Sequence, residues 1–142
     1  MTRTRIALLV GGVLLGIQLV PVRRTNPPVT APVVAPPAVQ AVLRRACFDC
    51  HSHETTWPLQ AYLAPASWLV AHDVSEGRQE LNFSRWDQVD LKKVASKLPH
   101  EVGGGDMPPW FYVVAHPGAR LSDAERTLLS DWARGLAEVK TP

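Results

Sequence analysis

The chain has 142 residues, of which 46% are hydrophobic, and its formal net charge is +2. This length suits one small domain once targeting and linker segments are set apart. Four of the 15 basic residues are arginines within the first 24 positions, so 11 basic residues face 13 acidic ones in the remaining chain. A slightly acidic domain argues against nucleic acid as a partner.

The N-terminal segment, residues 1–24, is predicted to be a membrane anchor or signal segment. Its apolar run, IALLVGGVLLGIQLV at 6–20, has arginines on both sides. Extended to Val22 as a helix it would be about 25 Å long, which is short for a bilayer core of about 30 Å but sufficient if Arg23 and Arg24 snorkel. Small residues suited to cleavage do not directly follow the run, which favours an uncleaved anchor.

The next segment, TNPPVTAPVVAPP at residues 25–37, contains five prolines and no charge. Proline removes the backbone donor that a regular helix needs. A polyproline-like conformation, at about 3.1 Å per residue, would make a semi-rigid spacer of about 40 Å. A disordered tether and a segment lying along the domain surface are the alternatives. We therefore expect a Pro-rich linker at 25–37 and a folded domain at 38–142.

Apolar residues in this domain recur at intervals of three and four, which is typical of amphipathic helices, and we expect an all-α fold. The two cysteines continue the apolar stripe of the first predicted helix, and His51 shares their face. The stripe consists of Val39, Val42, Leu43, Ala46, Cys47 and Cys50.

Three further helices follow. The second is expected to start at Pro65 and stop near Gly77, and it carries Trp68, Leu69 and His72. The third contains Leu91, Val94, Ala95 and Leu98, with Lys92, Lys93 and Lys97 facing water. The last begins with a capping box, Ser122 to Glu125, and continues through Leu129, Trp132, Leu136 and Val139.

Between the third and last helices, residues 102–118 (VGGGDMPPWFYVVAHPG) are rich in glycine and proline and are predicted to be irregular. Met107, the only methionine besides the initiator, lies in this loop before two prolines. A flexible side chain that fills a gap is one explanation. A thioether ligand held in place by the restricted backbone of Pro108 and Pro109 is the other.

The stretch ACFDCHSHE at 46–54 contains both cysteines, and four chemistries are compatible with it. A redox dithiol expects a preceding strand, whereas a helix is predicted there. Structural zinc needs four closed ligands, but His72, His100 and His116 are scattered. A disulfide between Cys47 and Cys50 would constrain little chain and leaves His51 unexplained.

Covalent attachment of a c-type haem explains all three motif residues together. Two thiols one helical turn apart reach the two vinyl groups on one edge of a haem, and His51 lies beneath the iron. Haem of this type is attached outside the cytoplasmic membrane, so residues 25–142 are expected at the periplasmic face of the bacterial inner membrane. One haem, attached through Cys47 and Cys50, is the predicted cofactor.

Five segments beyond the anchor match a known pattern: NPPV (26–29), CFDCHSHETTWP (47–58), APASWLVAHDVSEGRQELNFSRW (64–86), MPPWFYVVAHPGARLSDAER (107–126) and DWA (131–133). Together they resemble the bacterial haem-binding domain family, a group of small cytochrome-c-like proteins. The resemblance covers nearly all of the chain beyond the anchor, and His53 stands where the family commonly has asparagine. It implies haem c binding within a cytochrome-c-like helical domain, with His51 as proximal and Met107 as distal iron ligand.

Other residues are weaker candidates for the haem environment. His72, on the apolar side of the second helix, competes with Met107 for the sixth iron position, although a core role is common for such a histidine. Trp57 and Trp110 could pack on the porphyrin or donate an indole N–H to a propionate. Arg78 could pair with a propionate or serve the surface or the helix end.

A filled sixth position favours electron transfer over reaction with oxygen or peroxide. The sequence contains no acid pair, nucleophile triad or phosphate-binding loop, so the protein is not expected to be an enzyme. The predicted function is a membrane-anchored periplasmic electron carrier that serves redox partner proteins at the membrane. A haem-based sensor or peroxidase-like module with an open or displaceable sixth position is the alternative.

Overall fold

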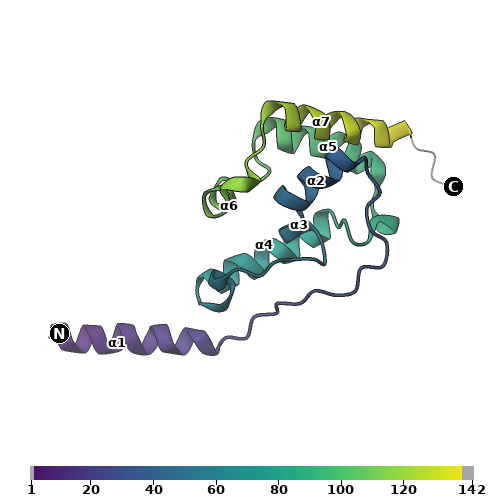
Figure 1. Ribbon diagram of the computed structural model, residues 1–142. Coiled ribbons are helices and arrows are strands. Elements are labelled where there is room, and N and C mark those ends of the chain that lie inside the picture. Colours follow the sequence, from purple (N-terminus) through teal and green to yellow (C-terminus); the bar gives the residue numbers. More distant parts are fainter. Residues whose placement is uncertain (1, 139–142) are drawn as a thin grey trace.

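The computed structural model of the protein describes residues 2–138, and this part is helical, with no β-strand (Figure 1). The expected all-α class is therefore confirmed. The elements are α1 (Arg3–Gly16), η1 (Ile17–Leu19), α2 (Pro37–Ala46), α3 (Phe48–His51), η2 (Leu59–Tyr62), α4 (Ala66–Glu80), η3 (Trp86–Gln88), α5 (Leu91–Gly104), α6 (Trp110–Ala115), η4 (Pro117–Ala119), α7 (Asp123–Gly135) and η5 (Leu136–Glu138).

Helix α1 projects away from the rest of the protein and buries none of its residues (Figure 1). Its helical backbone ends at Leu19 through the turn η1, three residues before the expected end at Val22. Across residues 2–138, no helix meets the length and hydropathy needed to cross a membrane.

The Pro-rich segment lies along the folded domain, which was one of the alternatives named from the sequence, and forms neither a free spacer nor a disordered tether. Residues 25–36, called the strap from here on, lie extended along the domain, and Val33 is buried in the core. Proline-rich backbone can do this because three of its remaining N–H groups find carbonyl partners outside the strap. The backbone bonds run from Thr30 and Ala31 to Ser84, from Val33 to Phe83, and from Trp86 back to Ala31.

Helix α2 buries the predicted stripe of Val39, Val42, Leu43 and Ala46. The helix does not continue through both cysteines, because Cys47 leaves helical geometry with φ −128°. A separate short helix, α3, then carries Cys50 and His51. Both cysteines line a cleft beside the core, and Cys47 also packs against the core itself, which local periodicity could not indicate.

Two further boundaries differ from the sequence prediction. Helix α4 starts after Pro65 as expected but runs through Gly77 to Glu80. The supposed loop at 102–118 contains the end of α5, which stops where Gly105 takes a left-handed φ of 85°. It also contains α6, a six-residue apolar helix that starts directly after Pro109.

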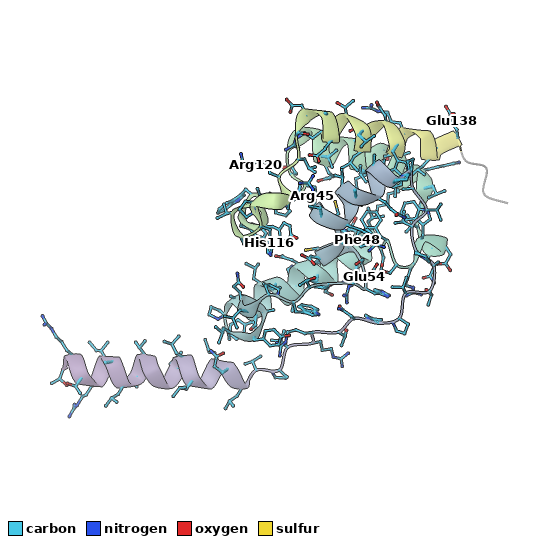
Figure 2. The ribbon with its side chains drawn as sticks, viewed as in Figure 1. Arg45, Phe48, Glu54, His116, Arg120 and Glu138 are labelled. Carbon is cyan, nitrogen blue, oxygen red and sulfur yellow. The ribbon has the colours of Figure 1, made fainter. Side chains whose placement is uncertain are left out.

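Helices α5 and α7 pack together and close the domain opposite α3 and α4. The capping box at Ser122 and Glu125 is formed as predicted. Arg45 on α2 donates to the backbone oxygens of Gly118 and Arg120 and pairs with Glu125, which fixes the connection into α7 (Figure 2). Val139, predicted for the last helix, lies outside the described residues.

A chain of stacked aromatic rings joins α3 to α7 through the core. Ring centroids are 5.3 Å apart for Phe48 and Phe83, 6.0 Å for Phe83 and Trp86, and 5.9 Å for Trp86 and Trp132. The N–H of Phe83 donates to the carbonyl of His51 at 2.8 Å. This aromatic chain anchors the segment that carries the histidine of the CFDCH motif.

Candidate functional site

A cleft separates the wall formed by α3 and α4 from the wall formed by α5 and α6. It has two adjoining lobes of about 160 and 210 Å³, each at least tenfold larger than the space for one water of about 15 Å³. Most of its lining is apolar, which suits a largely buried organic ligand. Both lobes are lined by Cys47, His51, Glu80, Val102 and Met107.

His51 is oriented by a backbone contact on α4's C-terminal side. Its Nδ1 lies 3.0 Å from the carbonyl oxygen of Leu81, so Nδ1 carries the proton and donates it. This fixes the ring and leaves Nε2 free as a ligand atom. Burial lowers the pKa of His51, which favours the neutral imidazole that metal ligation requires.

Cys47 and Cys50 are free thiols that are only partly exposed. Burial is the main cause that raises the pKa of Cys47 to about 12 and that of Cys50 to about 11, so both are uncharged at neutral pH. Across residues 2–138, no group of three or more His, Cys, Asp or Glu side chains is placed to hold a metal ion. Residues 2–138 therefore do not provide the closed set of four ligands that structural zinc requires.

Gly77 allows α4 to lie directly against the motif. A Cβ built on Gly77 would be 2.6 Å from the carbonyl oxygen of Cys50, a distance that atoms do not tolerate. Only a residue without a side chain permits this approach. Gly77 was predicted as a helix end, but its physical role is to bring the backbone of α4 next to Cys50 and so to form one wall of the cleft.

Met107 lines both lobes on the opposite wall, although its side chain is only half-buried. Its position depends on the C-terminus of α5, where Glu101 accepts backbone bonds from Asp106 at 3.0 Å and Met107 at 3.1 Å. Beyond it, the Tyr112 hydroxyl donates to Asp49 Oδ2 at 2.7 Å. Asp49 lies between the two cysteines, so this bond ties α6 to the motif.

The structure places the weaker sequence candidates away from the cleft. Trp110 is 76% exposed, and its neighbours Phe111 and Tyr112 line the cleft instead. Trp57 does not line either lobe, and its buried indole N–H has no acceptor among residues 2–138. His72 is exposed and belongs to a separate groove, because the apolar side of α4 to which it was assigned does not face the core.

Arg78, for which the sequence left a propionate role and a surface or helix-end role open, binds the segments on either side of the motif. Its guanidinium donates to the carbonyls of Ser52 at 2.7 Å and Thr25 at 2.8 Å. It also donates to Asn26 Oδ1 at 3.1 Å and Thr55 Oγ1 at 2.9 Å. These four bonds hold the strap against the segment that follows His51.

His53 plays a similar part, and its surroundings are buried rather than solvent-facing. Its Nδ1 lies 2.9 Å from the carbonyl oxygen of Pro28 and donates to it, while Nε2 accepts from the Asn82 amide at 3.0 Å. The contact made at the position of the family's common asparagine thus connects the motif to the strap.

Sequence reasoning missed a charged cluster at the mouth of the cleft. Lys93 and Lys97 of α5, predicted to face water, line one lobe together with Glu80 of α4. Glu80 Oε2 accepts from Lys97 at 2.8 Å and from Lys93 at 3.1 Å. These two hydrogen bonds lower the pKa of Glu80 to about 2. A helical spacing of four between the lysines was the available signal.

The residues of the cleft fit a haem. An imidazole with a free Nε2 lies on one wall, a thioether on the other, and two uncharged thiols at one edge, with apolar side chains between them. Gly77 removes the side chain that would obstruct the approach of α4 to the motif. Fold and site together define a small all-helical haem protein.

Comparison with family models agrees with this class. Residues 12–135 match the haem-binding domain, and the chain belongs to this family. The resemblance stated from the sequence is therefore confirmed. No curated protein and no solved structure matches the chain.

Proposed function

We propose that the protein is a monohaem c-type cytochrome, an electron carrier that is anchored at the periplasmic face of the inner membrane. The observation that carries the proposal is the cleft itself. It brings Cys47, Cys50 and His51 to one wall and Met107 to the other, although some 56 residues separate the two groups in the chain. Haem ligation accounts for both groups in one site.

The two thiols would attach the cofactor. Each Sγ–H adds across one vinyl group, so that a C–S bond forms, the hydrogen goes to the neighbouring carbon, and no net oxidation takes place. The neutral thiols at pH 7 keep this edge of the cleft free of charge. Gly77 keeps the backbone of α4 close to Cys50. The thiol edge of the cleft would therefore stay next to the wall formed by α4.

His51 and Met107 would be the axial ligands. His51 offers Nε2, because the Leu81 carbonyl holds the proton on Nδ1. Met107 offers a thioether from a backbone fixed by Glu101. Bound haem supplies a reversible one-electron Fe(III)/Fe(II) couple, and a methionine ligand raises its potential.

Lys93 and Lys97 replace Arg78 as the expected partners of the propionates. Arg78 is engaged by four protein acceptors, whereas the two lysines stand at the open side of the cleft and share one carboxylate, Glu80. Their flexible side chains can exchange Glu80 for a propionate without moving the backbone.

The N-terminal helix supports the membrane-anchored part of the proposal. Apolar residues surround α1 on every side, and a helix of this kind requires an apolar environment. The flanking arginines can reach the headgroup region. A redox partner at the same membrane would then meet the domain by diffusion in two dimensions.

Intact-mass measurement tests the proposal. The full chain is made in a host with cytochrome maturation machinery, and the mass is measured after denaturation together with a pyridine haemochrome spectrum. We expect the mass of one haem to be added to the chain, and the addition to be lost in the Cys47→Ala, Cys50→Ala double variant. A denatured wild-type chain without added mass would contradict covalent attachment.

A haem-based sensor with a displaceable sixth ligand is the second candidate, and one observation favours it. Helix α6, which follows Met107, buries none of its residues, so this wall is lightly packed. Carbon monoxide binding to the ferrous protein distinguishes the two functions. Rapid binding to the wild-type protein favours the sensor, and its absence favours the electron carrier.

A further inference from the structure

Large apolar side chains that take no part in the cleft gather on two protruding segments. One is the corner formed by η2 and the start of α4, residues 59–69. The other is α6, whose six residues WFYVVA include none that is buried. The residues more than half exposed are Leu59, Tyr62, Leu63, Leu69, Trp110 and Val114.

These two segments lie at the same end of the domain. In Figure 1 the corner and α6 form the end from which α1 extends, while η5 lies at the opposite end. Helix α4, which begins at the corner, lines one lobe of the cleft with Asp73 and Gly77, and α6 lines the same lobe with Phe111 and Tyr112. The corner is therefore one end of the helix that faces α6 across this lobe.

Direct bonds connect the corner to the end of α1. The Gln18 amide donates to the carbonyl of Ala64 at 3.2 Å and accepts from the Ala64 N–H at 3.0 Å. The guanidinium of Arg24 donates to the carbonyl of Ala61 at 3.0 Å and lies 4.6 Å from the ring centre of Tyr62. A membrane that surrounds the C-terminal end of α1 would consequently also lie next to the corner.

A lipid surface fits this chemistry better than water does. Large apolar side chains that gather on exposed segments mark candidate interaction surfaces. Tryptophan and tyrosine favour the membrane interface, since each combines an apolar ring with a polar tip. Leucine side chains can insert to the acyl boundary, and arginines beside them can meet the headgroups.

We infer that the η2–α4 corner and α6 form a second membrane contact, which docks on the bilayer that holds α1. This inference rests on the membrane anchor of the proposed function and goes beyond it, because a tether alone would leave the domain free to tumble. Docking holds the domain in one orientation. The cleft lobe between α4 and α6 then opens toward the membrane surface and toward partners embedded there.

Photolabelling from the lipid phase tests the docking. The full-length haem-loaded protein is placed in nanodiscs of phosphatidylcholine and phosphatidylglycerol that contain a diazirine phospholipid, and adducts are mapped by mass spectrometry. We expect label in residues 59–69 and 110–114 as well as in 6–20. The control is Val34, which is 81% exposed on the strap and should remain unlabelled.

Two outcomes would overturn the inference. Label confined to 6–20 would show that the domain is anchored but does not dock on the membrane. The same result is expected if a second copy of the chain covers the two segments. Absence of label from 6–20 would contradict both the membrane anchor and the docking. The haem spectrum of the same sample reports the cofactor separately, so neither result bears on haem attachment.

A pair of matched variants sharpens the test. Leu63→Glu places a charge on the corner, and we expect label in 110–114 to fall several-fold while label in 6–20 is retained. Val34→Glu changes an equally apolar, exposed residue on the strap and should leave the labelling unchanged. Circular dichroism and the haem spectrum check that both variants fold. Undiminished label in 110–114 of Leu63→Glu would overturn the docking.

Discussion

The two walls of the cleft differ in how tightly hydrogen bonds and packing hold their residues in place. On the wall of α3 and α4, His51 is fixed through Leu81, and α4 touches the motif backbone at Gly77. Arg78 adds four hydrogen bonds to the segments around it. On the other wall, Met107 depends on the end of α5, and α6 buries no residue.

The contrast shows where the protein needs a fixed geometry. In the proposed function, a haem held by two thiols and one imidazole would require these three groups to keep a constant spacing, and dense packing provides it. The thioether on the opposite wall would make one bond and could follow small movements. We therefore expect ligand exchange on the wall of Met107.

The largest effect is expected from Gly77→Ala, which tests the packing of the first wall. The new Cβ would clash with backbone atoms of Cys50, which cannot move aside as a flexible side chain can. We expect the free energy of unfolding to fall by about 3 kcal/mol, measured by denaturant titration, and the yield of haem-loaded protein to drop. Gly103→Ala is the control, because open space surrounds that helical position. Equal free energies of unfolding for the two variants would contradict the proposed packing role of Gly77.

Arg78→Met tests the bonds between α4, the strap and the motif. Methionine keeps an apolar stem but removes the four donated hydrogen bonds. We expect a loss of about 2 kcal/mol in the free energy of unfolding. Arg44→Met removes the same charge at an exposed pair with Glu54 and should cost far less. If the main effect of Arg78→Met is instead on the reduction potential, a propionate role regains support.

Met107→Ala probes the lightly packed wall. We expect the fold to persist, because the side chain is half-buried, with a loss of about 1 kcal/mol in stability. The weak sulfur-to-iron absorption band should disappear, the potential should fall, and the ferrous protein should bind carbon monoxide. His72→Ala is the control and should leave the spectrum unchanged. An unaltered band in Met107→Ala would show that another residue is the sixth ligand.

The smallest effect concerns the lysines at the mouth of the cleft. In the Lys93→Gln, Lys97→Gln double variant we expect the potential to fall by a few tens of millivolts, because two positive charges near the cofactor favour its reduced form. Lys92→Gln, on the same helix but outside the cleft lining, is the control. A potential equal to that of the wild type would rule out these lysines as propionate partners.

The Lys93→Gln, Lys97→Gln double variant is also expected to change the pKa of Glu80. The lysines hold the pKa of Glu80 at about 2, so the ion pairs are fully formed above its ordinary pKa and are lost as the pH falls through about 2. Without the lysines, we expect Glu80 to titrate near its ordinary value. Nuclear magnetic resonance titration of the glutamate side chain would measure this change.

Sequence reasoning succeeded where the information was local. The capping box at Ser122 and the buried stripe of α2 both follow from helical periodicity or direct neighbours. It could not place Arg78, Trp110 and His72, because their surroundings depend on how whole segments pack. Nearness in sequence to a ligand did not bring Trp110 into the cleft, because the turn of α6 directs Phe111 and Tyr112 there instead.

By itself the sequence determined the family, since the segments that resemble the haem-binding domain are read directly from neighbouring residues, and the family match over residues 12–135 agrees. Only the tertiary structure decided what surrounds the CFDCH motif. The strap joined the core, Lys93 and Lys97 came to line the cleft, and the two apolar segments came to lie at one end of the domain. Helical periodicity sets which residues share a face, but the packing of whole helices against one another sets what each face meets.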